Sequence, residues 1–352
     1  MIDQVLWAGS HLPVSQMSDA GINPIAATGC TSATVAAQLP PYWQQQLVSV
    51  CKQHQLKLWV NVEATSPEQA ARLAHWWELE SGAGEYVRGY LVDDEPQFTG
   101  NKQYASPSDI VARIRALRTA TPKPLWLNLI GNTTARPYFD LGQQIDDHPD
   151  IYTVAVYPWM GADDPDNPKN LYLMDLGQAR WQVQQMLSWY NQSPADLSPT
   201  KGKICGVIAQ ASSWEWQFRS DKDQAHIQAF GRMTEAKFKQ MARLALGRRD
   251  PSQGDSWAPL NANLRDGRPV LAFLAWYGWI DPSPGRRGAG ESPEIRQMLL
   301  RTTQMVADWN IPSPYAPGAE PPKPEPEPPK PDTELKVKVP RHITRVTLEI
   351  ER

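Results

Sequence analysis

The chain has 352 residues, of which 41% are hydrophobic, and carries 35 basic and 38 acidic side chains with a formal net charge of −3. This length and apolar content suffice for one large core, and the balanced charge excludes a strongly basic surface, so we expect no nucleic-acid partner. No apolar run approaches the roughly 20 residues that a membrane span needs, so we expect no membrane insertion.

The amino terminus, Met1–Trp7, has no basic region before an apolar stretch, which predicts synthesis in the cytoplasm without a signal peptide. Three cysteines, Cys30, Cys51 and Cys205, make an odd number without paired spacing. That count argues against a disulfide framework. The six histidines show no metal-ligand spacing, so we expect no metal site and no other cofactor.

Apolar, β-rich runs alternate with segments whose apolar residues recur at helical spacing. The predicted strands are Gln4–Gly9, Ile22–Thr28, Leu56–Glu63, Val87–Asp94, Pro124–Ile130, Ile151–Tyr157, Lys203–Gln210 and Val270–Tyr277. The predicted helices are Tyr42–His54, Pro67–Glu80, Pro107–Ala120, Leu171–Asn191, Glu235–Leu246 and Pro293–Asn310. This alternation predicts an α/β fold, a (β/α)8 barrel of the TIM type over residues 1–310. A doubly wound open sheet is the alternative, but no glycine-rich phosphate loop follows the first predicted strand.

The composition changes after the last predicted helix. Residues 311–332 are rich in proline and predict an extended polyproline II linker. In residues 333–352, Leu, Val and Ile alternate with polar or charged side chains, which predicts two short strands or a hairpin. An isolated hairpin is marginally stable in water, so we expect this tail to dock on another protein or on a second copy of the chain. A disordered tail is the alternative.

Polar and aromatic residues gather at the carboxyl ends of the predicted strands. In a (β/α)8 barrel these ends meet on one face, where active sites are built. The candidate site residues there, or in the loops that follow, are Asn61, Glu63, Asp93, Glu95, Asn128, Tyr157, Gln210, Trp214, Trp276 and Trp279. A barrel without a binding function would not need this set on strands that are otherwise apolar.

The most specific pattern is the acidic triplet at the end of the fourth predicted strand. Because side chains alternate along a strand, we expect Asp93 and Glu95 to share the interior face with Gly89 and Leu91, and Asp94 to point the other way. Two close carboxylates repel when both are ionised, which favours protonation of one of them. A protonated Glu95 beside an ionised Asp93 is a workable general acid. The alternative is a salt-bridging acidic cluster at a strand end.

Several of these segments resemble glycoside hydrolase barrels. The run Gly89–Pro96 is similar to their fourth strand, which ends in the acid/base Glu, and its Asp-x-Glu part resembles that of family 18 chitinase-like barrels. Val154–Pro158 is similar to their sixth strand, and Ile208–Gln210 and Ala275–Trp279 to the ends of the seventh and eighth. The resemblance implies a glycosidase in which Glu95 is the general acid.

The sequence departs from that pattern at the seventh strand, where Gln210 stands in place of the expected nucleophilic Glu. Three mechanisms therefore stay open. In the first, the substrate assists: Glu95 protonates the leaving oxygen while Asp93 steadies an N-acetyl group of the sugar. In the second, Glu95 works with another carboxylate, for which the candidates are Glu63, Glu215 and Asp281. In the third, the barrel binds a glycan without cleaving it.

The 15 tryptophans favour a carbohydrate partner, because flat aromatic faces stack on sugar rings. We expect ligand contacts from Trp7, Trp159, Trp214, Trp216, Trp276 and Trp279, and helix packing from Trp59, Trp76, Trp77, Trp126, Trp181, Trp189 and Trp309. The leading hypothesis is a hydrolase of a cell-surface or cell-wall polysaccharide. The alternative is a non-catalytic glycan-binding or structural component of a phage tail or injection-type particle, which the tail would attach to the virion.

Overall fold

The computed structural model describes residues 2–7, 28–38, 41–97, 105–131, 133–141, 145–158, 161–163, 171–173, 175–192, 204–214, 232–248, 260, 271–278 and 286–311. The chain divides into two compact units, Met1–Ala316 and Pro317–Arg352. All described residues belong to the first unit. The linker from residue 312 onward and the tail, residues 333–352, lie outside the described residues and stay predictions.

Eight parallel strands close into a barrel, which confirms the predicted (β/α)8 architecture. The strands are β1 (Gln4–Trp7), β2 (Ser32–Ala36), β3 (Lys57–Asn61), β4 (Val87–Asp94), β5 (Leu125–Ile130), β6 (Ile151–Val156), β9 (Ile204–Gln210) and β11 (Leu271–Tyr277). Around the barrel their order is β1, β11, β9, β6, β5, β4, β3 and β2, and β2 pairs back with β1. Two short antiparallel pairs lie outside it: β7 (Gly161–Asp163) with β8 (Leu171–Leu173), and β10 (Ser213–Trp214) with β12 (Arg286–Arg287).

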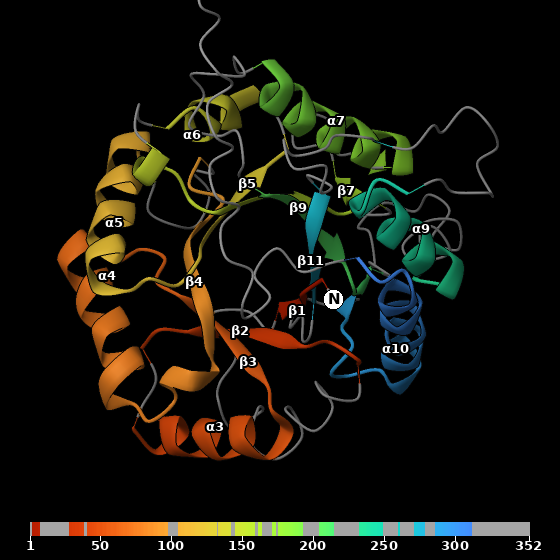
Figure 1. Ribbon diagram of the computed structural model, residues 1–352. Coiled ribbons are helices and arrows are strands. Elements are labelled where there is room, and N and C mark those ends of the chain that lie inside the picture. The colour runs from red at the N-terminus through yellow and green to blue at the C-terminus, as the bar shows by residue number, and fades with distance from the viewer. Residues whose placement is uncertain are drawn as a thin grey trace, which may run out of the picture. The chain divides into compact units, whose positions relative to one another are not determined.

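Seven α-helices accompany the strands in the described part of the chain, and Figure 1 shows them around the outside of the barrel. They are α3 (Pro41–His54), α4 (Pro67–His75), α5 (Pro107–Ala120), α6 (Arg136–Phe139), α7 (Leu176–Gln192), α9 (Glu235–Ala245) and α10 (Pro293–Asp308). A π-helical turn, Trp76–Glu80, continues α4. None of the described helices combines the length and the apolar character needed to cross a membrane.

Local chemistry explains why several predicted helices begin where they do. Ser66, Ser106 and Ser292 each cap a helix, with the hydroxyl accepting a backbone N–H three residues on and proline at the first helical position. At α5, the carboxylate of Asp109 also accepts the backbone N–H of Ser106 and completes a capping box. The predicted bounds of α5 are confirmed at both ends.

Two predicted elements are wrong. The second barrel strand is β2, Ser32–Ala36, and not Ile22–Thr28: Thr28 lies in a turn before it, and residues 22–27 lie outside the described residues. The predicted helix Leu171–Asn191 starts with strand β8, and α7 begins at Leu176. It begins there because Asp175 and Gln178 cap it reciprocally, each side chain accepting the backbone N–H of the other.

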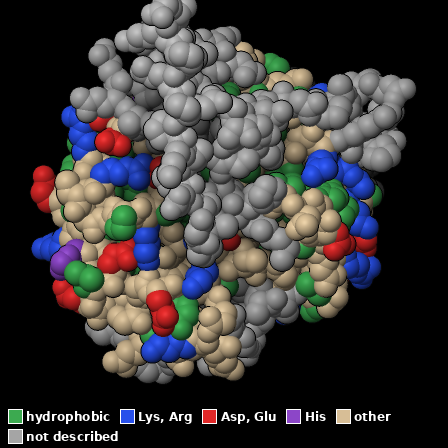
Figure 2. Space-filling view, in the orientation of Figure 1, with side chains coloured by type: hydrophobic (Ala, Val, Ile, Leu, Met, Phe, Trp, Pro, Cys, Tyr) green, Lys and Arg blue, Asp and Glu red, His purple; other side chains and the backbone are tan. Residues whose placement is uncertain are grey.

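Alternation along the strands creates two apolar cores. One fills the barrel interior, and its largest members are Trp7, Trp59, Trp126 and Phe273. The other lies between strands and helices and contains residues of the opposite strand faces, such as Trp276. On the outer surface, Figure 2 shows acidic and basic side chains interspersed over the described part of the face in view.

The three cysteines are buried and free. Burial raises the pKa of the Cys30 and Cys51 thiols to about 12, and also raises the pKa of the Cys205 thiol. At pH 8 we therefore expect no rapid reaction of the folded protein with dithionitrobenzoate, and three thiols reacting after unfolding in guanidinium. A thiol that reacts within minutes in the native state would contradict this burial.

Candidate functional site

Amide side chains line the inner wall at the carboxyl ends of three strands. Asn61 on β3, Asn128 on β5 and Gln210 on β9 are 6%, 0% and 0% exposed. Asn61 and Asn128 lie two residues beyond Trp59 and Trp126, and Gln210 two residues beyond Ile208, all of which belong to the interior core. By alternation the amides face the same interior, one layer above the aromatic cluster. The three amides that the sequence predicted for the site thus share the interior face of the barrel.

A β-bulge reverses the predicted orientation of the acidic triplet. Between β4 and β5 the register runs from Leu91 opposite Trp126 to Asp93 opposite Leu127, so Val92 is an extra residue. Asp94 then lies opposite Asn128. The prediction that Asp93 shares the interior face with Gly89 and Leu91 is therefore wrong, and Asp94 is the residue that turns inward.

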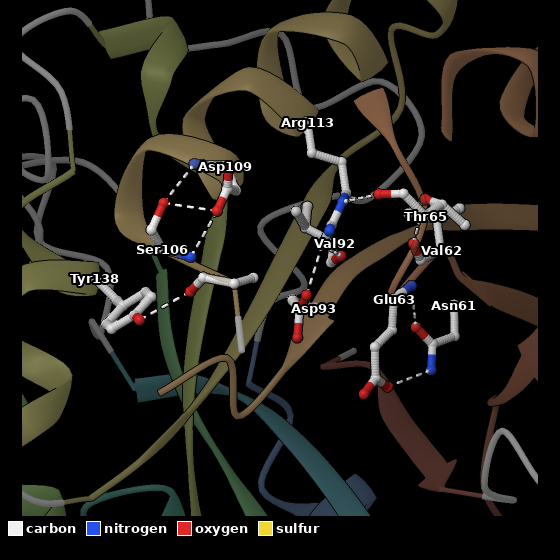
Figure 3. Close-up of polar contacts among 11 residues, drawn as sticks. Asn61, Val62, Glu63, Thr65, Val92, Asp93, Ser106, Asp109, Arg113 and Tyr138 are labelled. Atoms are coloured by element: carbon white, nitrogen blue, oxygen red, sulfur yellow. Dashed lines mark hydrogen bonds and ion pairs between the residues drawn. The ribbon is translucent and has the colours of Figure 1, made fainter. Parts of the chain in front are cut away.

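Asp93 lies in the layer between barrel and helices and is 3% exposed. Its carboxylate forms an ion pair with Arg113 of α5, 2.5 Å from Oδ2 to Nη1 (Figure 3). Arg113 also donates to the carbonyl oxygens of Thr65 and Val92. One buried guanidinium thus connects the loop after β3 to the bulge of β4. Asp93 binds this guanidinium and faces away from the barrel interior.

Asp94 contacts Asn128 across β4 and β5. Nδ2 of Asn128 donates to Oδ1 of Asp94 at 2.7 Å. Sequence reasoning missed Asp94 as an interior residue because it assumed an unbroken strand, and no residue type in the triplet signals the bulge.

Glu95 follows at the end of the strand. Its backbone N–H donates to the carbonyl oxygen of Asn128 at 3.0 Å, and its side chain is half-buried. Its φ of 52° places it in the left-handed region, which costs a residue other than glycine free energy and is common at functional sites. The structure therefore places Glu95 directly beside Asp94 and Asn128, in a strained turn at the mouth of the barrel.

Glu63 is held by Asn61 at the end of β3 (Figure 3). The backbone N–H of Glu63 donates to Oδ1 of Asn61 at 2.9 Å, and Nδ2 of Asn61 donates to Oε2 of Glu63 at 3.3 Å. Ala64, which follows, also has a positive φ, 58°. The predicted carboxylate of β3 is thus half-buried and fixed by its own strand.

Two tyrosines flank Gln210 on the neighbouring strands. Tyr277 lies opposite Gln210 in the register, Tyr157 follows β6, and the two rings are 5.0 Å apart. Nε2 of Gln210 donates to the carbonyl oxygen of Ser212, whereas its Oε1 is buried and has no hydrogen-bond partner within the described structure.

The structure contradicts one of the predicted tryptophan–ligand contacts and leaves others outside the described residues. Trp276 points outward, is fully buried, and lies 5.8 Å from the Phe238 ring of α9. It packs a helix because Phe273, Ala275 and Tyr277 occupy the interior face of β11. Trp279 and the side chain of Trp214 lie outside the described residues, so their predicted roles stay predictions.

Among the described residues, no three His, Cys, Asp or Glu side chains gather in a way that could hold a metal ion. The chemistry available at the described strand ends is therefore that of carboxylates, amides and phenols. Carboxylates can transfer protons, and amides and aromatic rings can orient a polar ligand with apolar faces.

No family model and no curated protein matches this sequence. Similar solved structures include a mutant β-1,3-glucanosyltransferase from Rhizomucor miehei, with 9% identity, a TM-score of 0.47, and 82% of this chain and 91% of that chain covered. The spore cortex-lytic enzyme SleL of Bacillus cereus has 11% identity, a TM-score of 0.41 and coverages of 86% and 74%. A dipeptide epimerase from Enterococcus faecalis V583 has 10% identity, a TM-score of 0.33 and coverages of 60% and 48%. Likenesses this weak carry no functional argument, and the fold rests on the strand pairing itself.

Proposed function

We propose that this barrel is a glycosidase that acts on a cell-surface or cell-wall polysaccharide, with Glu95 as its general acid. Three features at the strand ends support the proposal: carboxylates, buried amides, and the ring pair of Tyr157 and Tyr277. They lie beside a barrel interior that aromatic side chains fill. Glycoside hydrolysis needs a carboxylic acid that protonates the leaving oxygen and a second carboxylate. Amides and aromatic faces suit the hydroxyl groups and apolar faces of a sugar.

The observation that carries this proposal is the bulge at Val92. It turns Asp94 toward Asn128 on the interior side and leaves Glu95 as the next residue. In our proposal Asp94, and not Asp93, is the second carboxylate, because Asp93 is engaged by Arg113 on the other side of the sheet. Substrate assistance through Asp93 is accordingly no longer part of the proposal.

Asn61, Gln210, Tyr157 and Tyr277 are proposed to bind the sugar. Oε1 of Gln210, which has no hydrogen-bond partner among the described residues, can only accept a hydrogen bond, so it favours a ligand group with an O–H or N–H. A buried acceptor without a partner costs about 1–3 kcal/mol, which a bound hydroxyl would recover.

The test compares wild type with Glu95→Gln on peptidoglycan, purified capsule polysaccharides and chitin oligosaccharides. The amide cannot donate a proton to the leaving oxygen, so we expect sugar release to fall at least about 100-fold. Release is measured as new reducing ends and by mass spectrometry of the products, and binding by affinity electrophoresis on the same polymers. Binding should be retained, because the substitution preserves the size of the side chain.

Glu85→Gln is the matched control, since Glu85 is an exposed carboxylate just before the amino end of the same strand, β4. It should release sugar at the wild-type rate. Equal release by wild type and Glu95→Gln would refute the role of Glu95.

A second candidate is a glycan-binding component that does not cleave, such as part of a phage tail or injection-type particle. Gln210 favours it, because an amide stands where glycosidase barrels resembling this chain carry a nucleophilic carboxylate. In that case residues 333–352 would attach the chain to a protein partner or to a second copy of itself. Retention on one polymer together with no release from any of them would support this candidate over the enzyme.

A further inference from the structure

A chain of hydrogen bonds runs from the aromatic interior to the candidate site carboxylate. The indole Nε1 of Trp126 donates to Oγ1 of Thr153 at 2.7 Å, and this hydroxyl donates to Oδ1 of Asn128 at 2.8 Å. Nδ2 of Asn128 then donates to Oδ1 of Asp94 at 2.7 Å. Trp126, Thr153 and Asn128 are all 0% exposed. The chain therefore lies within the barrel and ends at its mouth.

Strand register explains why these side chains meet. Asp94 lies opposite Asn128, and Asn128 lies opposite Thr153, so the three sit side by side on β4, β5 and β6. Trp126 is two residues before Asn128 on the same face of β5. Without the bulge at Val92, Asp93 would lie opposite Asn128 and face the interior, and Asp94 would point outward.

The donors and acceptors fix the direction of the chain. An indole N–H can only donate, so Oγ1 of Thr153 accepts from Trp126 and its own proton is available for Asn128. Oδ1 of Asn128 accepts that proton, which leaves Nδ2 facing Asp94. If the Asn128 amide were rotated by half a turn, its Oδ1 would face Oδ1 of Asp94. Two oxygen atoms at this distance repel unless the carboxyl group of Asp94 carries a proton.

We infer that Thr153 and Asn128 are positioning residues that direct an N–H donor at Oδ1 of Asp94 and thereby favour Asp94 as the ionised carboxylate of the site. This inference rests on the proposed function for its catalytic consequence. It assigns the two neighbouring carboxylates different tasks: Glu95 supplies the proton, and Asp94 supplies the negative charge. A glycosidase needs that division, because one carboxyl group must be protonated while the other is ionised.

The experiment uses the full chain and Thr153→Val, which keeps the side-chain shape and removes the hydroxyl. In ¹H–¹⁵N NMR spectra we expect the Trp126 indole proton to shift upfield because it loses its acceptor, Oγ1 of Thr153. The Asn128 side-chain amide protons should also shift, because Oδ1 of Asn128 loses the donor that orients the amide toward Asp94. With the polysaccharide that wild type cleaves, kcat should fall about 100-fold, as for a displaced catalytic group, while KM stays within about twofold. Thr153→Ser, which retains the hydroxyl, should restore both the spectra and kcat.

Thr121→Val is the matched control. Like Thr153, Thr121 is buried, and its hydroxyl donates to a side-chain oxygen, in this case Oε1 of Glu78 at 3.0 Å. Thr121 precedes the amino end of β5, at the opposite end of the strand from Asn128. It should change neither the Trp126 and Asn128 signals nor kcat.

The outcomes separate this inference from the proposed function. Unchanged Trp126 and Asn128 signals in Thr153→Val would overturn the inference whatever the activity. An unchanged kcat in Thr153→Val, with activity lost in Glu95→Gln, would overturn it while the glycosidase proposal stands. If no polymer is cleaved, the spectra of the valine and serine variants alone decide whether Thr153 orients Asn128 toward Asp94.

Discussion

Replacing Arg113 with methionine is expected to lower the free energy of unfolding by about 3–5 kcal/mol. The substitution leaves the carboxylate of Asp93 buried without its cation, and removes the donor from the carbonyl oxygens of Thr65 and Val92. Methionine fills much of the volume of the arginine stem, so the loss reflects the unpaired polar groups more than a cavity. Equilibrium unfolding in urea, followed by circular dichroism, measures it.

Two further variants establish the cause. In the double variant Arg113→Met/Asp93→Asn the buried charge is gone, so we expect part of the stability to return. Arg301→Met is the matched control: Arg301 is 57% exposed and pairs with Glu235, and an exposed pair contributes at most about 1 kcal/mol. If Arg113→Met and Arg301→Met cost the same, the buried ion pair does not stabilise this face of the barrel.

The elements that the sequence predicted well are those with local signals. A serine followed by proline and an acidic residue marks the starts of α4 and α10, and the capping box at Ser106 marks α5. Side-chain hydrogen bonds within four residues create these signals, so they can be read without the rest of the fold.

The second strand could not be predicted in the same way. Ser32–Ala36 is short and has only two β-branched residues, Thr34 and Val35, so its local β signal is weak. The segment Ile22–Thr28 has two isoleucines, but Pro24 argues against a central strand there. Ser32–Ala36 is a strand because β1 and β3 lie on either side of it and satisfy its backbone groups. Closure of the barrel is a tertiary constraint, and it overrides local propensity.

The same distinction applies to the candidate site. Parallel strand ends meet at one edge, so the approximate position of Asn61, Asn128 and Gln210 follows from the pattern alone. The roles of Asp93 and Asp94 do not, because one extra residue in β4 exchanges the faces that they occupy. Arg113 was missed for a related reason: an arginine inside a helix gives no sign that it will be buried against a strand.

The environments of the individual tryptophans show that a high tryptophan content does not by itself predict which of them pack helices and which fill the barrel interior. Trp77 and Trp189 are buried in the core between strands and helices, as expected, but Trp181 on α7 is 47% exposed. Trp59 and Trp126 were expected to pack helices, yet they belong to the barrel interior. Which face of a strand a tryptophan occupies decides its role, and that depends on register.

Replacing Trp126 with alanine is expected to lower the free energy of unfolding by about 3–5 kcal/mol. Its ring lies 5.3 Å from Trp7, 5.7 Å from Trp59 and 4.7 Å from Phe273, between centroids, so the substitution empties the centre of the interior cluster. It also removes the donor to Thr153. Thermal and urea unfolding measure the loss.

Trp181→Ala is the control of identical chemistry, and because Trp181 is exposed we expect it to cost less than about 1 kcal/mol. The difference follows from the geometry of an eight-stranded barrel, whose interior is just wide enough to be filled by side chains. The filling is tight here, because a Cβ at Gly89 would lie 2.4 Å from the Trp59 ring. We therefore expect the neighbouring rings to fill the space left by Trp126 only in part. A loss as small as that of Trp181→Ala would mean that the interior relaxes, and the aromatic cluster could then not serve as a rigid floor beneath Asn128 and Asp94.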